Sequence, residues 1–353
     1  MHMHLIIAIM LLITAGLSFV EERLYKRDKI FILVGYAFIM VYLATTKSIE
    51  NTADASIYER FFYKNDNLLI SLTTEPTYIY LSRLVLNLGG TVSTMFLIYA
   101  LISIPAKIKA LYDITPYIFT ALLIYIPVYF ELHDMIQIRA AAAAMFLLAS
   151  LIPLSNNQRL RALLLMGCAI AFHYSSAVYL PFLLIGNRKM GITIRVIIAL
   201  LFPICFAMYL LKIDLISFIP ELSSAIGYKL EKYKESSAKG GWEEFYPLYA
   251  NIYYVSKVAM LYLCLYFYDY LTEKLRMAPL LISLFSVSVL FLPVMATIPV
   301  IASRVSDLFG IVDCIIFTFL LYFIKPDYWA KIAIAFVGLY MIVFNILFTE
   351  HFT

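Results

Sequence analysis

Arg139 stands at the head of a long apolar segment, where arginine is rare. The sequence Gln137-Ile138-Arg139 leads directly into five alanines and then into further apolar residues. A guanidinium keeps its charge, so near a bilayer it needs an anion, water or the membrane interface. Such residues often mark the path of a substrate or an ion. We interpret Arg139 as a candidate anion-binding residue; the alternative is a side chain that extends to the interface.

A second candidate is His173, in the sequence Phe172-His173-Tyr174-Ser175-Ser176 between two short apolar runs. Irregular backbone at such a break can line a cavity in a membrane protein. The imidazole could act there as a base or a proton donor, and Ser176 is a candidate substrate contact. The alternative is a histidine that is hydrogen-bonded to the neighbouring hydroxyls for structure alone.

Two acidic residues precede these segments. Asp54 and Tyr58 are four residues apart and share a face if their stretch is helical. Glu75 comes directly before Pro76, which favours the first turn of a helix over residues 76–89. Helix capping alone would explain both carboxylates.

Arg304 begins another apolar helix, and Asp307, three residues later, could neutralise it. Arg139 and Arg304 together would suit a diphosphate, since guanidinium groups bind phosphate oxygens in pairs. Gln137 is two residues from Arg139, so the two point to different faces of a regular helix. Either only one faces the site, or the helix starts irregularly at this point.

The composition indicates the class of protein that positions these residues. The 353 residues are 63% hydrophobic and 14% charged, whereas soluble domains are about half apolar and a quarter charged. Continuous apolar runs of spanning length recur along the chain, so we predict an all-α, polytopic integral membrane bundle. The first run reads as a retained helix. The four cysteines have no metal-like spacing, no phosphate-binding glycine loop is present, and the charge gives no sign of nucleic acid binding. We expect no metal and no cofactor.

About 12 transmembrane helices are predicted from these runs, in one transmembrane domain over residues 1–353. Their ranges are 3–20, 30–46, 91–111, 116–131, 134–154, 159–173, 175–186, 192–211, 251–271, 278–297, 304–324 and 331–348.

Lysine and arginine predict the orientation of these helices. One set of short connections is basic, so we place it in the cytoplasm. Its residues are Arg23, Lys26, Arg27, Lys29, Lys107, Lys109, Arg159, Arg161, Arg188, Lys189, Arg195, Lys274, Arg276, Lys325 and Lys331. The longer polar loops near 47–75 and 212–250 are then external. Seven candidate residues fall on or near the same side, namely Asp54, Tyr58, Glu75, Gln137, Arg139, His173 and Arg304. The second of these loops carries a mixed-charge patch over residues 229–235 and is expected to be a lid or a partly ordered loop.

The order of these motifs resembles the EpsG family of bacterial exopolysaccharide and O-antigen polymerases, which are related in role to Wzy. The resemblance rests on Asp54 with Tyr58, Glu75-Pro76, Gln137-x-Arg139 before alanines, Phe172-His173 with its serines, and Arg304. One departure is Ala140, where family members often have a second glutamine.

The resemblance implies a GT-C-like membrane glycosyltransferase of the bacterial inner membrane with its active site facing the periplasm. It would join oligosaccharide repeat units carried on undecaprenyl diphosphate, with both donor and acceptor held in the lipid bilayer. Arg139 and Arg304 would hold the diphosphate, and His173 or Asp54 would orient or deprotonate the acceptor. Tyr58, Glu75, Gln137 and Ser176 would bind sugar or shape the site. A chain-length regulator protein is a candidate partner.

Three other functions remain open from the sequence. An O-antigen ligase would use the same lipid diphosphate donor with a different acceptor. A membrane O-acyltransferase would also carry a buried histidine. A transporter or flippase of lipid-linked oligosaccharide should show inverted repeats or charges along both halves of a pathway, and the sequence shows neither.

Overall fold

The computed structural model describes residues 2–49, 52, 54–64, 74–213 and 248–348. These residues form helices and connecting turns with no strand, which confirms the predicted all-α class. The chain divides into two compact units: unit 1 comprises Met1–Gly186 and Phe317–Thr353, and unit 2 comprises Asn187–Ile316. Each unit is described by itself. The mixed-charge patch of the 212–250 loop lies outside the described residues.

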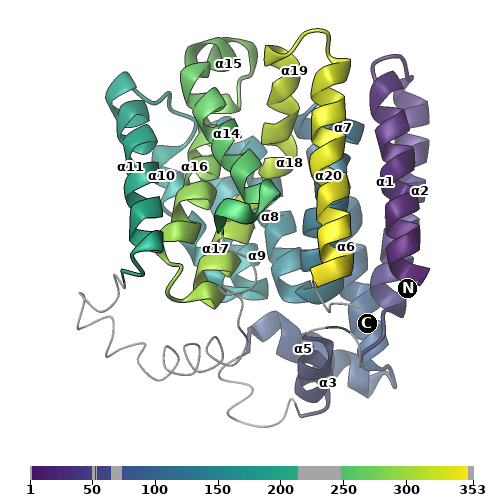
Figure 1. Ribbon diagram of the computed structural model, residues 1–353. Coiled ribbons are helices and arrows are strands. Elements are labelled where there is room, and N and C mark those ends of the chain that lie inside the picture. The colour runs from purple at the N-terminus through teal and green to yellow at the C-terminus, as the bar shows by residue number, and fades with distance from the viewer. Residues whose placement is uncertain (1, 50–51, 53, 65–73, 214–247, 349–353) are drawn as a thin grey trace. The chain divides into compact units, whose positions relative to one another are not determined.

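Unit 1 carries seven of the eight candidate site residues, and its α-helices are labelled in Figure 1. Its helices are α1 (His2–Val20), α2 (Lys26–Thr46), α3 (Ala55–Tyr63), α5 (Pro76–Asn87), α6 (Val92–Ile114), α7 (Ile118–Ile124), the π-helix η1 (Tyr125–Ile136), α8 (Ile138–Ser155), α9 (Arg159–Phe172), the 3₁₀ helix η2 (Tyr174–Tyr179), α10 (Phe182–Ile185), the 3₁₀ helix η5 (Phe317–Phe319), α19 (Leu320–Phe323) and α20 (Tyr328–Phe348).

Close helix contacts hold unit 1 together. Helix α8 packs against both α6 and α9, α2 packs against α6, and α1 and α20 pack against α7 and against each other. Gly338 allows the close approach of α20, because a Cβ atom there would lie 2.3 Å from the carbonyl oxygen of Leu123 in α7. Small residues serve this purpose in membrane helices, where backbones approach closely.

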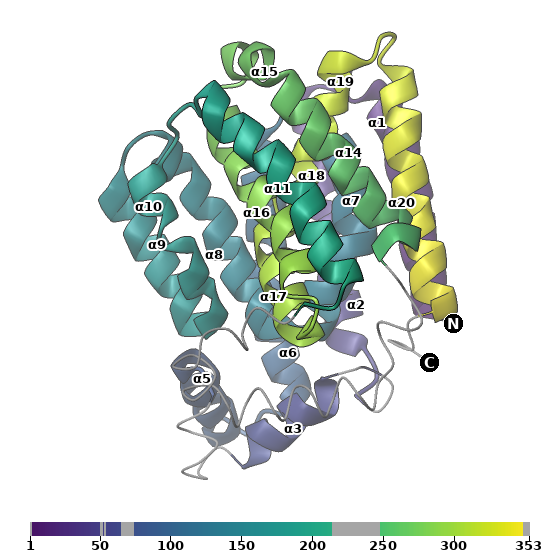
Figure 2. The same cartoon turned by 60° about the vertical axis from the view of Figure 1, so that its left-hand side comes forward.

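The short helices α3 and α5 lie at one end of unit 1. In Figures 1 and 2 they sit beyond the end of α2 and the beginning of α6. The helices of this unit alternate in direction, so the junctions η1–α8 and α9–η2 fall at the same end. The short turns after α1, α6 and α8 fall at the other end, and several basic residues that we assigned to the cytoplasm lie in these turns or in the adjoining helix ends, such as Arg23, Lys26 and Arg159. This arrangement supports the predicted separation of the candidate residues from the basic turns.

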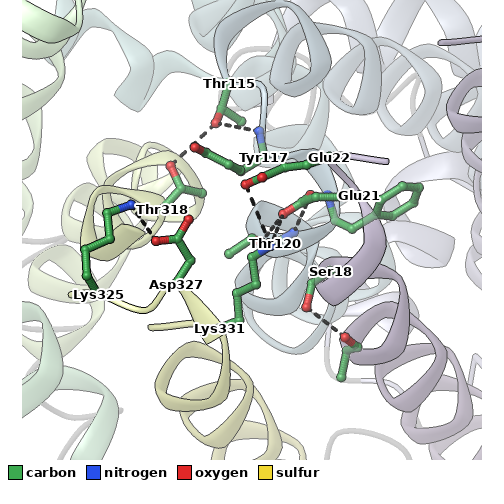
Figure 3. A network of polar contacts seen from close by, with 12 residues as sticks. Ser18, Glu21, Glu22, Thr115, Tyr117, Thr120, Thr318, Lys325, Asp327 and Lys331 are labelled. Atoms are coloured by element: carbon green, nitrogen blue, oxygen red, sulfur yellow. Dashed lines mark hydrogen bonds and ion pairs between the residues drawn. The ribbon is translucent and has the colours of Figure 1, made fainter. Parts of the chain in front are cut away.

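The opposite end of unit 1 is fixed by the buried carboxylate of Glu21, which follows α1 (Figure 3). Its oxygens accept hydrogen bonds from the backbone N–H groups of Phe119 and Thr120, at 2.9 and 3.3 Å, and from the Thr120 hydroxyl. Lys331 of α20 lies 3.8 Å away. A carboxylate at the beginning of a helix satisfies N–H groups that have no partner within the helix. Glu21 therefore joins α1, α7 and α20.

One lysine that we predicted in a short cytoplasmic connection, Lys107, is buried within a helix instead. Lys107 lies inside α6 with no exposed surface, and its Nζ atom is 2.7 Å from the carboxylate of Asp134 in η1. Ser103 and Tyr125 also donate hydrogen bonds to this carboxylate, at 2.5 and 2.8 Å. Hydropathy averaging could not separate a buried lysine near a helix end from a lysine in the following turn.

Unit 2 consists of α11 (Ile192–Leu210), the 3₁₀ helix η4 (Leu248–Ala250), α14 (Ile252–Tyr266), α15 (Tyr268–Lys274), α16 (Ala278–Val294), α17 (Pro299–Gly310) and α18 (Asp313–Ile316). A buried ion pair lies at its centre, where Lys257 Nζ is 2.9 Å from Asp313. Lys257 also donates to Ser288 at 2.7 Å, and Tyr253 donates to Asp313 at 2.7 Å. These contacts join α14, α16 and α18.

Seven helices among the described residues are long and apolar enough to cross a membrane, which supports a multi-pass membrane protein. An eighth span results if α17 and the segment Asp313–Phe323, which meet at a bend of 50°, are counted together. Several of the predicted spans are shorter apolar helices, such as Tyr174–Ile185 and Ile252–Tyr266. The count of about 12 and the GT-C-like architecture are therefore not confirmed.

Candidate functional site

Glu75 is the centre of a polar cluster in unit 1 that joins residues far apart in the sequence. One carboxylate oxygen pairs with Nη1 of Arg139, and the other lies 2.9 Å from Nδ1 of His173. Glu75 occupies the N-cap position of α5, yet its side chain makes no capping hydrogen bond. The interpretation that the Glu75 carboxylate caps α5 is therefore wrong, since this carboxylate contacts Arg139 and His173 instead.

The environment of Glu75 keeps it ionised. The side chain is 6% exposed, and burial alone would raise the pKa of the carboxyl group. The hydrogen bond with His173 and the charge of Arg139 outweigh burial and hold the pKa of Glu75 below its ordinary value. The carboxylate can therefore fix the orientation of both partners.

Arg139 lies in the first turn of α8, between aromatic rings. Its guanidinium carbon is 5.3 Å from the ring centre of Tyr58 and 5.9 Å from that of Tyr78. Its side chain is 19% exposed, so the interpretation that it extends freely to the interface is wrong. Glu75 contacts one nitrogen of the guanidinium, and a guanidinium carries five N–H donors. The geometry leaves Arg139 able to bind a second anion.

An aromatic row supports this cluster from α3, α5, α6 and α9. The rings of Tyr58 and Tyr78 lie 5.8 Å apart, those of Tyr78 and Tyr99 lie 6.2 Å apart, and those of Tyr99 and Phe172 lie 5.7 Å apart. The Tyr78 hydroxyl donates to the backbone oxygen of Tyr58 at 2.7 Å. These large rings exclude water from one side of the site, which strengthens the electrostatic interactions within it.

His173 lies where α9 ends. Its backbone is extended, with φ −155° and ψ 112°, and its N–H bonds to the oxygen of Ala169 at 2.8 Å. The helix stops there and η2 begins at the next residue, so the imidazole projects from a break in the chain as predicted. Its partner is Glu75, however, and not a neighbouring serine. A carboxylate on Nδ1 fixes the tautomer of a histidine and leaves Nε2 to exchange a proton with a ligand.

Ser176 lies one turn after His173, and its backbone N–H bonds to the His173 oxygen at 3.0 Å. Its side chain is fully buried, and among the described residues its hydroxyl has no hydrogen-bond partner. A buried hydroxyl usually has a partner. Ser176 is consistent with a contact that a ligand or water completes.

Gln137 separates the π-helix from α8. Its φ of −98° and ψ of 63° are not helical, so α8 begins irregularly there, which is one of the two alternatives that the sequence left open. Long π-helical segments are rare and are associated with functional sites. The break lies two residues before Arg139 and sets the direction in which that side chain leaves the helix.

Asp54 occupies the N-cap position of α3 without capping it through its side chain. Its backbone is left-handed, with φ 63°, a conformation that is uncommon outside glycine but that aspartate and asparagine adopt more often than other residues. The carboxylate acts electrostatically on Tyr58 and on Lys47. The structure thus places Asp54 near the Tyr58 side of the cluster, with no direct contact to Arg139 or His173 among the described residues.

Arg304 belongs to α17 in unit 2. It is half-buried and makes no ion pair with any described residue. Asp307, the partner considered from the sequence, instead interacts electrostatically with Lys257 and Asp313. Joint binding of one diphosphate by Arg139 and Arg304 stays a prediction, because the two residues lie in different units.

Two residues near the cluster were missed in the sequence analysis. Neither Lys47 nor Asp134 was among the candidate residues. Both are buried, and Lys47 donates a hydrogen bond to the backbone oxygen of Met135 in η1. An isolated lysine directly after a spanning helix was the available signal. No group of three or more His, Cys, Asp or Glu side chains in the described ranges could hold a metal ion.

The comparisons with known proteins agree with the resemblance seen in the motifs. No curated protein and no solved structure matches the chain significantly. The model of the EpsG family matches residues 29–352, which is nearly the whole chain and includes every residue of the cluster around Glu75. The chain therefore belongs to the EpsG family.

Proposed function

We propose that this protein is a Wzy-type polysaccharide polymerase. It joins undecaprenyl-diphosphate-linked oligosaccharide repeat units by glycosyl transfer at the periplasmic face of the inner membrane. Membership of the EpsG family supports a polymerase-type membrane protein of exopolysaccharide or O-antigen synthesis. One observation carries the proposal further: the carboxylate of Glu75 contacts both Arg139 and His173 at one end of unit 1.

In this reaction, a hydroxyl of one lipid-linked unit attacks the anomeric carbon of the chain on a second carrier. The new glycosidic C–O bond forms while the C–O bond to the carrier diphosphate breaks, and the departing oxygen keeps the electron pair. The hydroxyl proton must go to a base. The lipid carriers require that these groups meet close to the bilayer surface.

His173 is the favoured base of the two that the sequence left open. Glu75 holds Nδ1 at 2.9 Å, which directs Nε2 to the acceptor hydroxyl and stabilises the imidazolium that forms. Asp54 lacks such an orienting partner and interacts with Lys47 and Tyr58 instead. We assign Asp54 to the support of the Tyr58 segment and of the acceptor sugar.

Arg139 would stabilise the negative charge that develops on the departing diphosphate. A donor held in place by two aromatic rings and a carboxylate does not need to reorganise during the reaction, which is how preorganised charges lower a barrier. The charge of Arg139 is partly offset by Glu75, so a second cation is useful. Arg304, which has no ion pair among the described residues, is the candidate for this role. Tyr58, Gln137 and Ser176 would contact the sugars.

Gene deletion and complementation in the cell of origin test this proposal. Loss of a polymerase leaves single repeat units on the lipid carrier. Loss of a ligase would leave long chains on the carrier, and loss of a flippase would leave single units on the cytoplasmic face. We expect single repeat units on the lipid carrier in the deletion strain. The wild-type gene should restore long polysaccharide chains, and the Arg139→Ala and His173→Ala variants should not. The control is Arg161→Ala, an exposed arginine at the other end of α9 that bonds only to Gln158 among the described residues; it should restore long chains. Long chains in the deletion strain would disprove the proposal.

A further inference from the structure

Lys47 is a buried lysine directly after α2, and none of the roles assigned above includes it. It is 5% exposed. Its Nζ atom lies 4.2 Å from the ring centre of Phe96 and donates a hydrogen bond to the backbone oxygen of Met135. A lysine is almost never fully buried unless it is paired, so these contacts need an explanation.

The carbonyl of Met135 lies in the last turn of η1, which ends at Ile136. The N–H group of Gln137 bonds to the oxygen of Leu132 in the π-helical pattern at 2.9 Å, and Gln137 then leaves the helical conformation. The last carbonyls of a helix lack partners within it and favour a cation. Lys47 supplies a donor to one of these carbonyls, that of Met135, which lies four residues before Arg139 at the junction where α8 begins.

Lys47 also faces the other half of the cluster. The carboxylates that act on its ammonium are Asp134 of η1 and Asp54. Asp54 begins α3, and four residues later the ring of Tyr58 lies against the Arg139 guanidinium. Burial lowers the pKa of Lys47 to about 7, against the opposing effect of these two carboxylates. The interactions of one ammonium group thus reach both segments that surround Arg139.

We propose that Lys47 is a positioning residue. It holds the η1–α8 junction through the Met135 carbonyl and packs on the ring of Phe96, which belongs to the same buried core as Tyr58, so that Arg139 stays between Glu75 and Tyr58. Its importance for catalysis depends on the proposed function, whereas its effect on the junction does not.

Thiol labelling tests the effect on the junction directly. A cysteine is introduced by Gln137→Cys in the full chain, in a Cys168→Ser background, because Cys168 is the exposed native cysteine and the other three are buried. The rate of reaction with N-ethylmaleimide is measured in detergent. Lys47→Met should raise this rate about tenfold, since the hydrogen bond to the Met135 carbonyl is lost, and Lys47→Arg should stay close to wild type.

Lys331→Met is the matched control, since Lys331 is also a buried lysine of unit 1 but contacts Glu21 at the other end. It should leave the labelling rate unchanged, which separates the local effect from general damage. Elution as a single species in size-exclusion chromatography establishes that each variant is folded. If Lys47→Met does not fold, the comparison of Lys47→Gln with Lys47→Arg replaces it. An unchanged rate in the neutral variant, or an equal rise in Lys331→Met, would overturn the inference.

The second readout is polymer formation by the Lys47 variants of the protein, made without the added cysteine. We expect Lys47→Met to lower kcat more than it raises KM, and Lys47→Arg to restore most of the activity. If labelling responds as expected but the wild-type chain forms no polymer, the proposed function fails and the positioning role stands.

Discussion

The Nδ1 atom of His173 lies 2.9 Å from a carboxylate oxygen of Glu75, 98 residues earlier in the sequence. The second oxygen of the same carboxylate pairs with Arg139. A single buried carboxylate therefore orients a potential base and a potential anion-binding group at the same time. The potential base and the potential anion-binding group are thus held by different oxygen atoms of the same carboxylate.

Replacement of this carboxylate should affect the rate of reaction more than substrate binding. Glu75→Gln keeps the size of the side chain but removes the charge that stabilises an imidazolium at His173. We expect kcat to fall by about 10²- to 10⁴-fold, the usual contribution of general base catalysis, with a smaller change in KM. Steady-state kinetics on lipid-linked repeat units measures both. Glu59→Gln in the neighbouring α3 is the control, and an equal loss there would remove the special role of Glu75.

The shape of the Arg139 side chain should matter as well as its charge. Arg139→Lys keeps a cation but loses the planar group that lies between Tyr58 and Tyr78 and can bind phosphate oxygens in pairs. We predict that undecaprenyl diphosphate, added as a product inhibitor, binds about tenfold more weakly to this variant. Arg161→Lys provides the comparison. Unchanged inhibition by the lipid diphosphate would show that Arg139 does not contact it.

The stability of the protein should rise with pH because of Lys47. The pKa of this amine is about 7 in the folded chain and near 10.5 when exposed. Between these values the unfolded chain binds more protons than the folded chain, so the free energy of unfolding increases as pH rises from about 7. Thermal unfolding in detergent from pH 7 to pH 9 measures this slope. Lys47→Met should make the slope shallower, and an identical slope in the variant would contradict the assignment.

The contact between α20 and α7 should be intolerant of one added methyl group. A Cβ atom at Gly338 would meet the Leu123 oxygen, whereas a Cβ atom at Gly35 in α2 would meet nothing within 4 Å. We expect Gly338→Ala to destabilise the chain by about 1–3 kcal/mol through overpacking. Gly35→Ala should be neutral or stabilising by about 0.5–1 kcal/mol, because alanine favours a helix. Equal melting temperatures for the two variants would argue against this packing.

The helices were largely predictable because apolar periodicity and length depend on local sequence. The sequence also marked Glu75, Arg139 and His173 separately, through a proline, an apolar tail and a break between two runs. It could not show that they meet, since Glu75 lies 64 residues before Arg139 and capping explained it equally well. The π-helix before Gln137 and the burial of Lys47 and Lys107 depend on tertiary contacts, which hydropathy does not reveal.

The central claim is that this chain joins lipid-linked repeat units through the cluster around Glu75. The most direct test uses the purified full-length protein in lipid nanodiscs, with repeat units on undecaprenyl diphosphate isolated from the deletion strain. New glycosidic linkages and released undecaprenyl diphosphate are counted together. We predict one lipid diphosphate released for each linkage formed, and a loss of both by about 100-fold or more in a folded His173→Ala variant. Full activity of His173→Ala, or folded wild-type protein that forms no linkage between these units, would contradict the account.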